Sequence, residues 1–287
     1  MSSVPFLRSG ALALLLAWPA AAHLAPAFED SMAQRVLACT GCHGAEGRSA
    51  PDGYYPRIAG KPAGYLFHQL QNFRDGRRLY APMARLIAPL DEAYLREIAE
   101  HFAALDLPYA APPAGTAPPE TLALGQRLTV SGDPGRRLPA CAACHGAALT
   151  GVAPAVPGLL GLPRDYLVSQ LGAWRDGSRR AHAPDCMADL ARRMSPDEVV
   201  AVAQWLAAQP VPHPSKPLAS TSSLPAPPPL RCGSMDAVRP VDAPARLPRA
   251  SRHAPPRGTR EAGGAPVAET SASRGLVPGH AARRVVQ

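Results

Sequence analysis

The chain has 287 residues and carries 30 basic and 22 acidic side chains, which gives a formal net charge of +8. The excess lies after residue 210, where ten Arg and one Lys face four acids, so residues 1–210 are close to neutral. A nucleic-acid-binding surface is therefore not expected on the body of the protein. With 35 Pro and 24 Gly, a bundle of long transmembrane helices is excluded as well.

Residues 1–22 have the three parts of an export signal. Arg8 supplies the positive start, residues 11–18 form an apolar run, and residues 20–22 are small alanines that precede His23. This pattern predicts a signal peptide that is cleaved on export and a periplasmic protein. The apolar run is too short to span a bilayer. A buried N-terminal helix and an uncleaved anchor are the alternatives.

Two Cys-x-x-Cys-His motifs dominate the rest of the chain: Cys39-Thr-Gly-Cys42-His43 and Cys141-Ala-Ala-Cys144-His145. Composition alone would give such a motif roughly 0.004 times per chain. Two thiols at this spacing reach the two vinyl groups of a haem, and the adjacent His becomes the proximal iron ligand. A zinc site would need further paired ligands, and a thioredoxin-type pair would follow a β-strand. The motifs therefore predict two covalently bound haem c groups.

The remaining cysteines, Cys186 and Cys232, form an even pair in a chain predicted to enter an oxidising compartment. A disulfide between them is one expectation, and two unpaired thiols are the other. Residues 230–233 are expected to pack back on the second half of the chain in the first case.

An internal repeat with an offset near 102 residues points to the second iron ligand. The repeat aligns Met83 with Met187, which lie 40 and 42 residues after the His of their motifs. Haem iron needs a sixth ligand for rapid one-electron transfer, and a thioether raises its potential relative to a second His. The two aligned Met are therefore the predicted axial ligands. Met194 aligns with an apolar position and is expected in the core. Three histidines without a matching His in the repeat are the alternative ligands: His68, His101 and His182.

Helical periodicity recurs in both halves. Apolar and aromatic side chains fall on one face over residues 65–73 and again over residues 166–174, and similar stripes cover residues 95–102 and 199–206. Ser195-Pro-Asp-Glu has the pattern of a capping box at the start of the last of these helices.

With the motifs, the repeat and the two Met in this order, residues 31–209 resemble a dihaem cytochrome c of the cytochrome c4 type. The resemblance implies an all-α fold of two tandem class I cytochrome c domains, each wrapped around one covalent haem. It also implies that the carbonyl groups of Pro56 and Pro157 accept hydrogen bonds from His43 and His145, and that the haems are close enough to exchange electrons.

The predicted organisation has five segments. They are a signal peptide (1–22), a first cytochrome c domain (23–106), a Pro-rich linker (107–119), a second cytochrome c domain (120–210) and a Pro/Arg-rich tail (211–287). The linker is expected to be semi-rigid because of its Pro content. Most of the tail is expected to be disordered, and peripheral contact of its basic residues with a membrane is an alternative to a solvated tail.

The predicted function is periplasmic electron transfer, not catalysis, because two six-coordinate irons leave no open site for a substrate. The resemblance implies a membrane quinol-oxidising complex or a dehydrogenase as donor and a terminal oxidase as acceptor. The near-neutral body predicts docking with weak salt dependence. An electron-transfer subunit of a specific dehydrogenase is the first alternative, and a dihaem peroxidase is a less favoured one.

Overall fold

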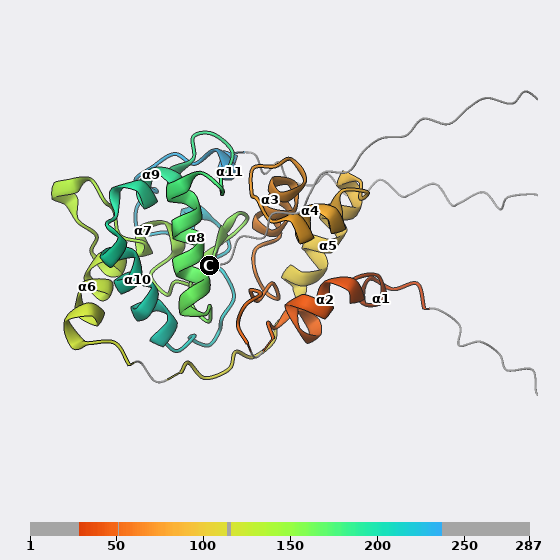
Figure 1. Cartoon of the computed structure of the whole chain (residues 1–287), viewed down its shortest axis with the longest axis horizontal. Coiled ribbons are helices and arrows are strands. Elements are labelled where there is room, and N and C mark those ends of the chain that lie inside the picture. Colours follow the sequence, from red (N-terminus) through yellow and green to blue (C-terminus); the bar gives the residue numbers. More distant parts are fainter. Residues whose placement is uncertain (1–28, 51, 114–115, 237–287) are drawn as a thin grey trace, which may run out of the picture. The chain divides into compact units, whose positions relative to one another are not determined.

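The computed structural model describes residues 29–50, 52–113 and 116–236 (Figure 1). The predicted signal peptide and the greater part of the predicted tail lie outside the described residues. Among the described residues, no helix combines the length and the hydrophobicity that a membrane crossing requires.

We call residues 29–106 the first half. Its elements are α1 (Met32–Arg35), α2 (Leu37–His43), η1 (Ala45–Gly47), α3 (Ala63–Arg74), α4 (Ala81–Ile87) and α5 (Glu92–Ala104). Helices α3 and α5 contain the two predicted apolar stripes and pack against each other. Asp91 begins α5 by accepting a hydrogen bond from the backbone N–H of Tyr94 at 2.8 Å. The core of this half is formed by Val36, Leu66, Phe67, Phe73, Ile87, Leu95, Ile98, Ala99 and Phe102.

We call residues 119–236 the second half. Its elements are α6 (Pro119–Val130), η2 (Pro134–Arg136), α7 (Ala142–His145), β1 (Gly151–Val152), β2 (Val156–Pro157), α8 (Arg164–Asp176), α9 (Cys186–Arg193), α10 (Pro196–Ala208), η3 (Thr221–Ser223) and α11 (Gly233–Asp236). The predicted helices over 166–174 and 199–206 are confirmed as α8 and α10, which pack against each other.

Helix α10 also packs closely on α6. A Cβ atom at Gly125 would lie 2.1 Å from the carbonyl oxygen of Ala201, so only glycine permits this approach of the two backbones. Met194 is 8% exposed and lies in the core of the second half, as the repeat predicts. The pairing of α6 with α10 gives this half an apolar frame around the second Cys-x-x-Cys-His motif.

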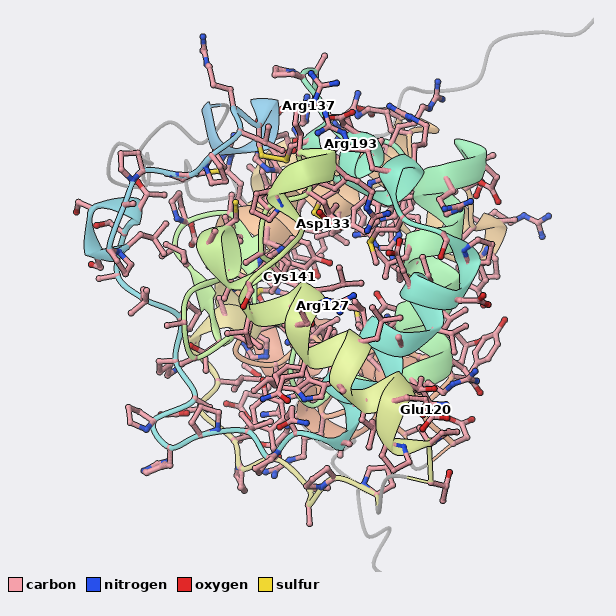
Figure 2. The ribbon with its side chains drawn as sticks, turned by 90° about the vertical axis from the view of Figure 1, so that its left-hand side faces the viewer. Glu120, Arg127, Asp133, Arg137, Cys141 and Arg193 are labelled. Atoms are coloured by element: carbon pink, nitrogen blue, oxygen red, sulfur yellow. A yellow bond between two sulfur atoms is a disulfide. The ribbon has the colours of Figure 1, made fainter. Side chains whose placement is uncertain are left out.

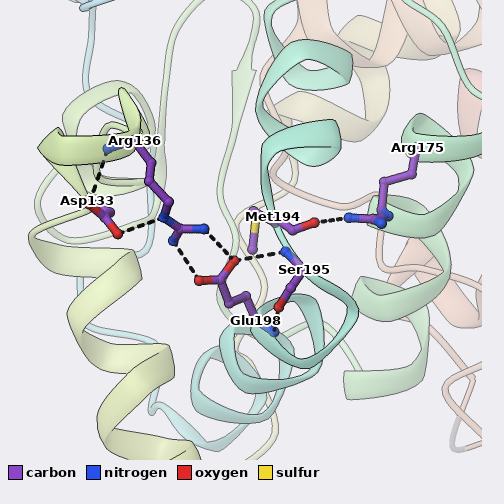
Figure 3. A network of polar contacts seen from close by, with 6 residues as sticks. All are labelled: Asp133, Arg136, Arg175, Met194, Ser195 and Glu198. Carbon is purple, nitrogen blue, oxygen red and sulfur yellow. Dashed lines mark hydrogen bonds and ion pairs between the residues drawn. The ribbon is translucent and has the colours of Figure 1, made fainter.

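The start of α10 is fixed by the predicted capping box. Ser195 accepts from the backbone N–H of Glu198 at 3.2 Å, and Glu198 accepts from the backbone N–H of Ser195 at 2.8 Å. The carboxylate of Glu198 also pairs with Arg136, which reaches back to Asp133 (Figure 3). At the same corner, Arg175 of α8 donates to the carbonyl oxygen of Met194. These contacts join η2, α8 and α10.

The first part of the predicted tail packs on the second half. Residues 211–236, which we call the strap, return to the second half and are ordered against it. The backbone of Leu218 exchanges hydrogen bonds with Gly151 and Ala153 at 2.9 and 2.8 Å, and Leu224 packs on Val152 in a small apolar cluster. The apolar side chains of the strap account for this packing. Residues 237–287 lie outside the described part of the chain.

Candidate functional site

The first Cys-x-x-Cys-His motif lies on α2, with His43 at its last turn. The imidazole is 8% exposed, and its Nδ1–H donates to the carbonyl oxygen of Pro56 at 2.8 Å. This bond fixes the tautomer and leaves Nε2 as the nitrogen that can bind a metal. Gly44 follows at φ +75°, where a Cβ atom would lie 2.4 Å from the carbonyl oxygen of Ser49. The chain therefore turns away directly after the His.

The second motif repeats this geometry at α7. His145 is 7% exposed, and its Nδ1–H donates to the carbonyl oxygen of Pro157 at 2.7 Å. Burial lowers the pKa of both His145 and His43, which keeps the two rings neutral near pH 7. Neutral imidazole is the form that ligates a metal.

Four thiols accompany the two histidines, and the structure forms no disulfide from them. Cys39 packs on the core of the first half and Cys141 on the core of the second, and Figure 2 shows Cys141 close to α6. Burial raises the pKa of Cys141 to about 11, and it also raises the pKa of Cys39 and Cys144. Before haem attachment, burial therefore favours the protonated thiol at these positions.

The two aligned methionines lie on short helices. Met83 is on α4 and packs on the same core cluster as Cys39. Met187 is on the first turn of α9 and is half-buried.

Helix α9 is anchored at both ends. Asp185 begins it by accepting from the backbone N–H of Ala188 at 3.0 Å. At its end, Arg193 donates to the carbonyl oxygen of Arg137 at 2.5 Å (Figure 2). The structure also joins Cys186, next to Met187, to Cys232 of the strap in a disulfide. The segment that carries Met187 is therefore held by the cap at Asp185, the bond from Arg193 and the disulfide of Cys186.

The three histidines considered as alternative iron ligands contact other aromatic rings. The rings of His68 and His182 contact each other across the two halves, with centroids 5.3 Å apart. The ring of His101 packs on Phe102.

A cluster of two guanidinium groups joins the halves, and sequence reasoning missed it. Arg78 donates to Gln69 of its own half and, across the halves, to Gln170 at 2.6 Å and Tyr166 at 3.1 Å. Arg179 mirrors this arrangement, with bonds to Gln170 and, across the halves, to Gln69 and Tyr65, at 2.8, 3.0 and 3.3 Å. The repeat contained the signal, because both arginines lie two residues after matched glycines.

The charge of this cluster is uncompensated. Arg179 is 4% exposed, and burial together with the charge of Arg78 lowers its pKa. Within the part of the chain that the structure describes, neither guanidinium forms an ion pair with a carboxylate. A buried cation normally has an anionic partner. A cofactor with its own carboxylates, such as haem, fits this set of donors.

Comparison with known proteins gives the same picture. No protein-family model matches the chain. The chain is 40% identical over 190 residues to a thiosulfate dehydrogenase electron acceptor from Thiomonas intermedia. The aligned region covers 65% of this chain and 85% of that protein. The chain is 32% identical over 187 residues to cytochrome c4 from Pseudomonas aeruginosa, covering 64% of this chain and 90% of that protein.

Two solved structures have the same fold. Reduced cytochrome c4 from Pseudomonas stutzeri matches with a TM-score of 0.55 at 26% identity, over 62% of this chain and 96% of that one. Thiosulfate dehydrogenase from Marichromatium purpuratum matches with a TM-score of 0.54 at 33% identity, over 60% of this chain but only 36% of that longer chain. The resemblance and the all-α tandem fold are thus confirmed. This chain belongs to the cytochrome c4 family of dihaem electron carriers, with two covalently bound haem c groups.

Proposed function

We propose that the chain is a periplasmic electron acceptor for a thiosulfate dehydrogenase. The observation that carries this proposal is its higher identity to an electron acceptor of that enzyme, 40%, than to cytochrome c4, 32%. The predicted export signal supports the periplasmic location. The terminal oxidase expected from the family resemblance remains the proposed acceptor, and a quinol-oxidising complex is the alternative donor.

In this proposal the four motif thiols attach the haems: Cys39, Cys42, Cys141 and Cys144. Each thiol would add across one vinyl group of the haem, forming a C–S bond and giving its hydrogen to the neighbouring vinyl carbon. The step needs no oxidant or reductant.

The axial ligands in the proposal are His43 and Met83 for the first iron, and His145 and Met187 for the second. When bound, each haem supplies an iron that takes up and releases one electron. The bonds from the two histidines to Pro56 O and Pro157 O hold the rings in place and increase their donor strength. Thioether ligands favour the reduced iron and so raise the potential.

The paired guanidinium groups of Arg78 and Arg179 complete the site. We assign them to the haem carboxylates, which would supply the negative charge that the cluster lacks. Because each arginine also bonds to the other half, neutralising them would stabilise the contact through which the two haems exchange electrons.

The partner is tested by rapid mixing of the holoprotein with thiosulfate dehydrogenase and thiosulfate, with the haem α-band followed over time. We expect fast reduction of both haems that depends on the enzyme and on thiosulfate. Reduction no faster than without the enzyme would overturn the proposed partner. Faster reduction by a quinol-oxidising complex would overturn it in favour of a general carrier.

The ligands are tested separately with Met83→Leu and Met187→Leu. Each substitution should remove one of two methionine–iron bands at the red end of the oxidised spectrum. Met194→Leu, in the core, is the matched control and should leave both bands in place. Retention of both bands in either ligand variant would overturn the assignment of that methionine.

A further inference from the structure

Lys61 reaches from the first half to the proximal loop of the second haem site. It is one of two lysines in the chain and is 5% exposed. Its Nζ donates to the carbonyl oxygen of Gly158 at 3.0 Å, 97 positions further along the chain. Gly158 directly follows Pro157, whose carbonyl oxygen accepts from His145. The amino group of Lys61, from the first half, therefore binds the loop that orients the proximal His of the second half.

This cation has no compensating acid within the described residues. The charged group that Lys61 faces is Arg57, whose guanidinium is bound to the carbonyl oxygens of Leu107 and Pro108. Burial lowers the pKa of Lys61 to about 7, and the charge of Arg57 adds to the effect.

The repeat shows that this contact is specific to one haem site. Gly60 aligns with Gly161, so the position that matches Lys61 is Leu162. Leu162 packs on the apolar core of the second half. The second half therefore has no ammonium group at the matching position that could bind the loop of Pro56.

We propose that Lys61 is a positioning residue for the second haem, which holds the loop behind His145 and raises the reduction potential of that haem. This inference rests on the proposed ligation of the second iron by His145. A positive charge near the iron disfavours the more positive oxidised state, and its effect is large where water is excluded. The same bond ties the proximal loop to the first half, which keeps the ring of His145 in a fixed orientation.

The test is a spectroelectrochemical titration of Lys61→Met below pH 7, where Lys61 is charged in the parent protein; the substitution removes the charge and keeps the length of the side chain. At a fixed poise we expect the ratio of reduced to oxidised second haem to fall on the order of threefold to tenfold. Lys61→Arg should restore most of the ratio. Lys216→Met, at the other lysine, is the matched control because Lys216 is exposed, and it should change neither haem.

The affected haem is identified in a Met187→His background, where a second His ligand lowers the potential of the second haem and separates the two waves. In this background, Lys61→Met should shift the redox wave of lower potential and leave the other wave in place. Equal shifts of both waves, or no shift, would overturn the inference. Haem content is measured on each variant, and the two methionine bands on each variant that keeps Met187, so that a failure of ligation is distinguished from a failure of the proposed role of Lys61.

Discussion

Replacing both Cys186 and Cys232 by Ser should release the end of the strap from the helix that carries Met187. The disulfide is a covalent closure between α9 and the strap. A backbone bond from Gly233 N–H to the carbonyl oxygen of Pro184, at 3.0 Å, lies beside it. Without the disulfide, this bond and the packing of Met235 on the apolar cluster of Val152 and Leu224 would still hold α11.

The size of the effect follows from the length of chain that the bridge closes. The two cysteines are 46 positions apart. Closing a loop of this length stabilises the folded state by about 4 kcal/mol through the entropy of the unfolded chain. The strap keeps its earlier anchors at Leu218 and Leu224 in the variant. We therefore expect a loss of about 2–4 kcal/mol from the unfolding free energy of the second half.

The assay is denaturant unfolding of the oxidised holoprotein, together with hydrogen exchange. Exchange should increase most for the amides of residues 225–236, beyond the anchor at Leu224. The methionine band of the second haem should weaken, because Met187 is next to the released position 186. Ser222→Ala is the matched control, because Ser222 lies exposed in the same strap and bonds to the side chain of Ser220.

Two results would refute this reasoning. An unchanged unfolding free energy with unchanged exchange over 225–236 would mean that the disulfide does not hold the strap. A loss spread equally over both halves, with both methionine bands weakened, would mean that the bridge acts on the whole unit and not on the segment of Met187.

Three further outcomes follow from buried or missing charges. Arg179→Gln should raise the rate of protease cleavage between the halves several-fold, since it loses bonds to both of them, and an unchanged rate would contradict the role of the cluster. Burial lowers the pKa of His68 to about 4, with the charges of His182, Arg77 and Arg96 adding. Because an unfolded His binds its proton near pH 6.5, stability should fall by roughly 1 kcal/mol per unit from pH 6.5 to about pH 4, and His68→Phe should flatten this dependence in acid unfolding curves. The rate of reduction by the donor should vary less than about twofold with ionic strength, because residues 1–210 carry 19 basic and 18 acidic groups, and a steep fall in stopped-flow rates would refute this.

Features that depend on local pattern were predictable from the sequence. The stripes over 65–73 and 166–174 became α3 and α8, and the Ser195 capping box begins α10 as expected. The bonds from His43 and His145 to the two proline carbonyl oxygens follow from the family resemblance. These features are repeated or lie within a few residues of each other, so a single sequence contains their signal.

Contacts between distant segments were not predictable in the same way. Lys61 and Gly158 are 97 positions apart, and nothing in the periodicity of either segment indicates that they meet. The anchoring of the strap at Leu218 has the same cause, since a bridge between distant strands depends on tertiary placement. Arg78 and Arg179 are an intermediate case, because the repeat marks them as a pair without showing that they cross to opposite halves.

The repeat also locates what makes the two haem sites unequal. Halves built on one pattern would give their irons similar surroundings, so any preferred direction of electron flow must come from positions where the pattern is broken. Two such breaks act on the second site: Lys61, which aligns with Leu162, stands behind His145, and the strap closes beside Met187. In the proposed ligation, one break would add charge beside His145 and the other would restrain the segment of Met187. Because the two act through different bonds, combining Lys61→Met with Cys232→Ser should change the potential of the second haem by nearly the sum of the separate effects. Strong non-additivity would show that both act through one shared movement of the domain.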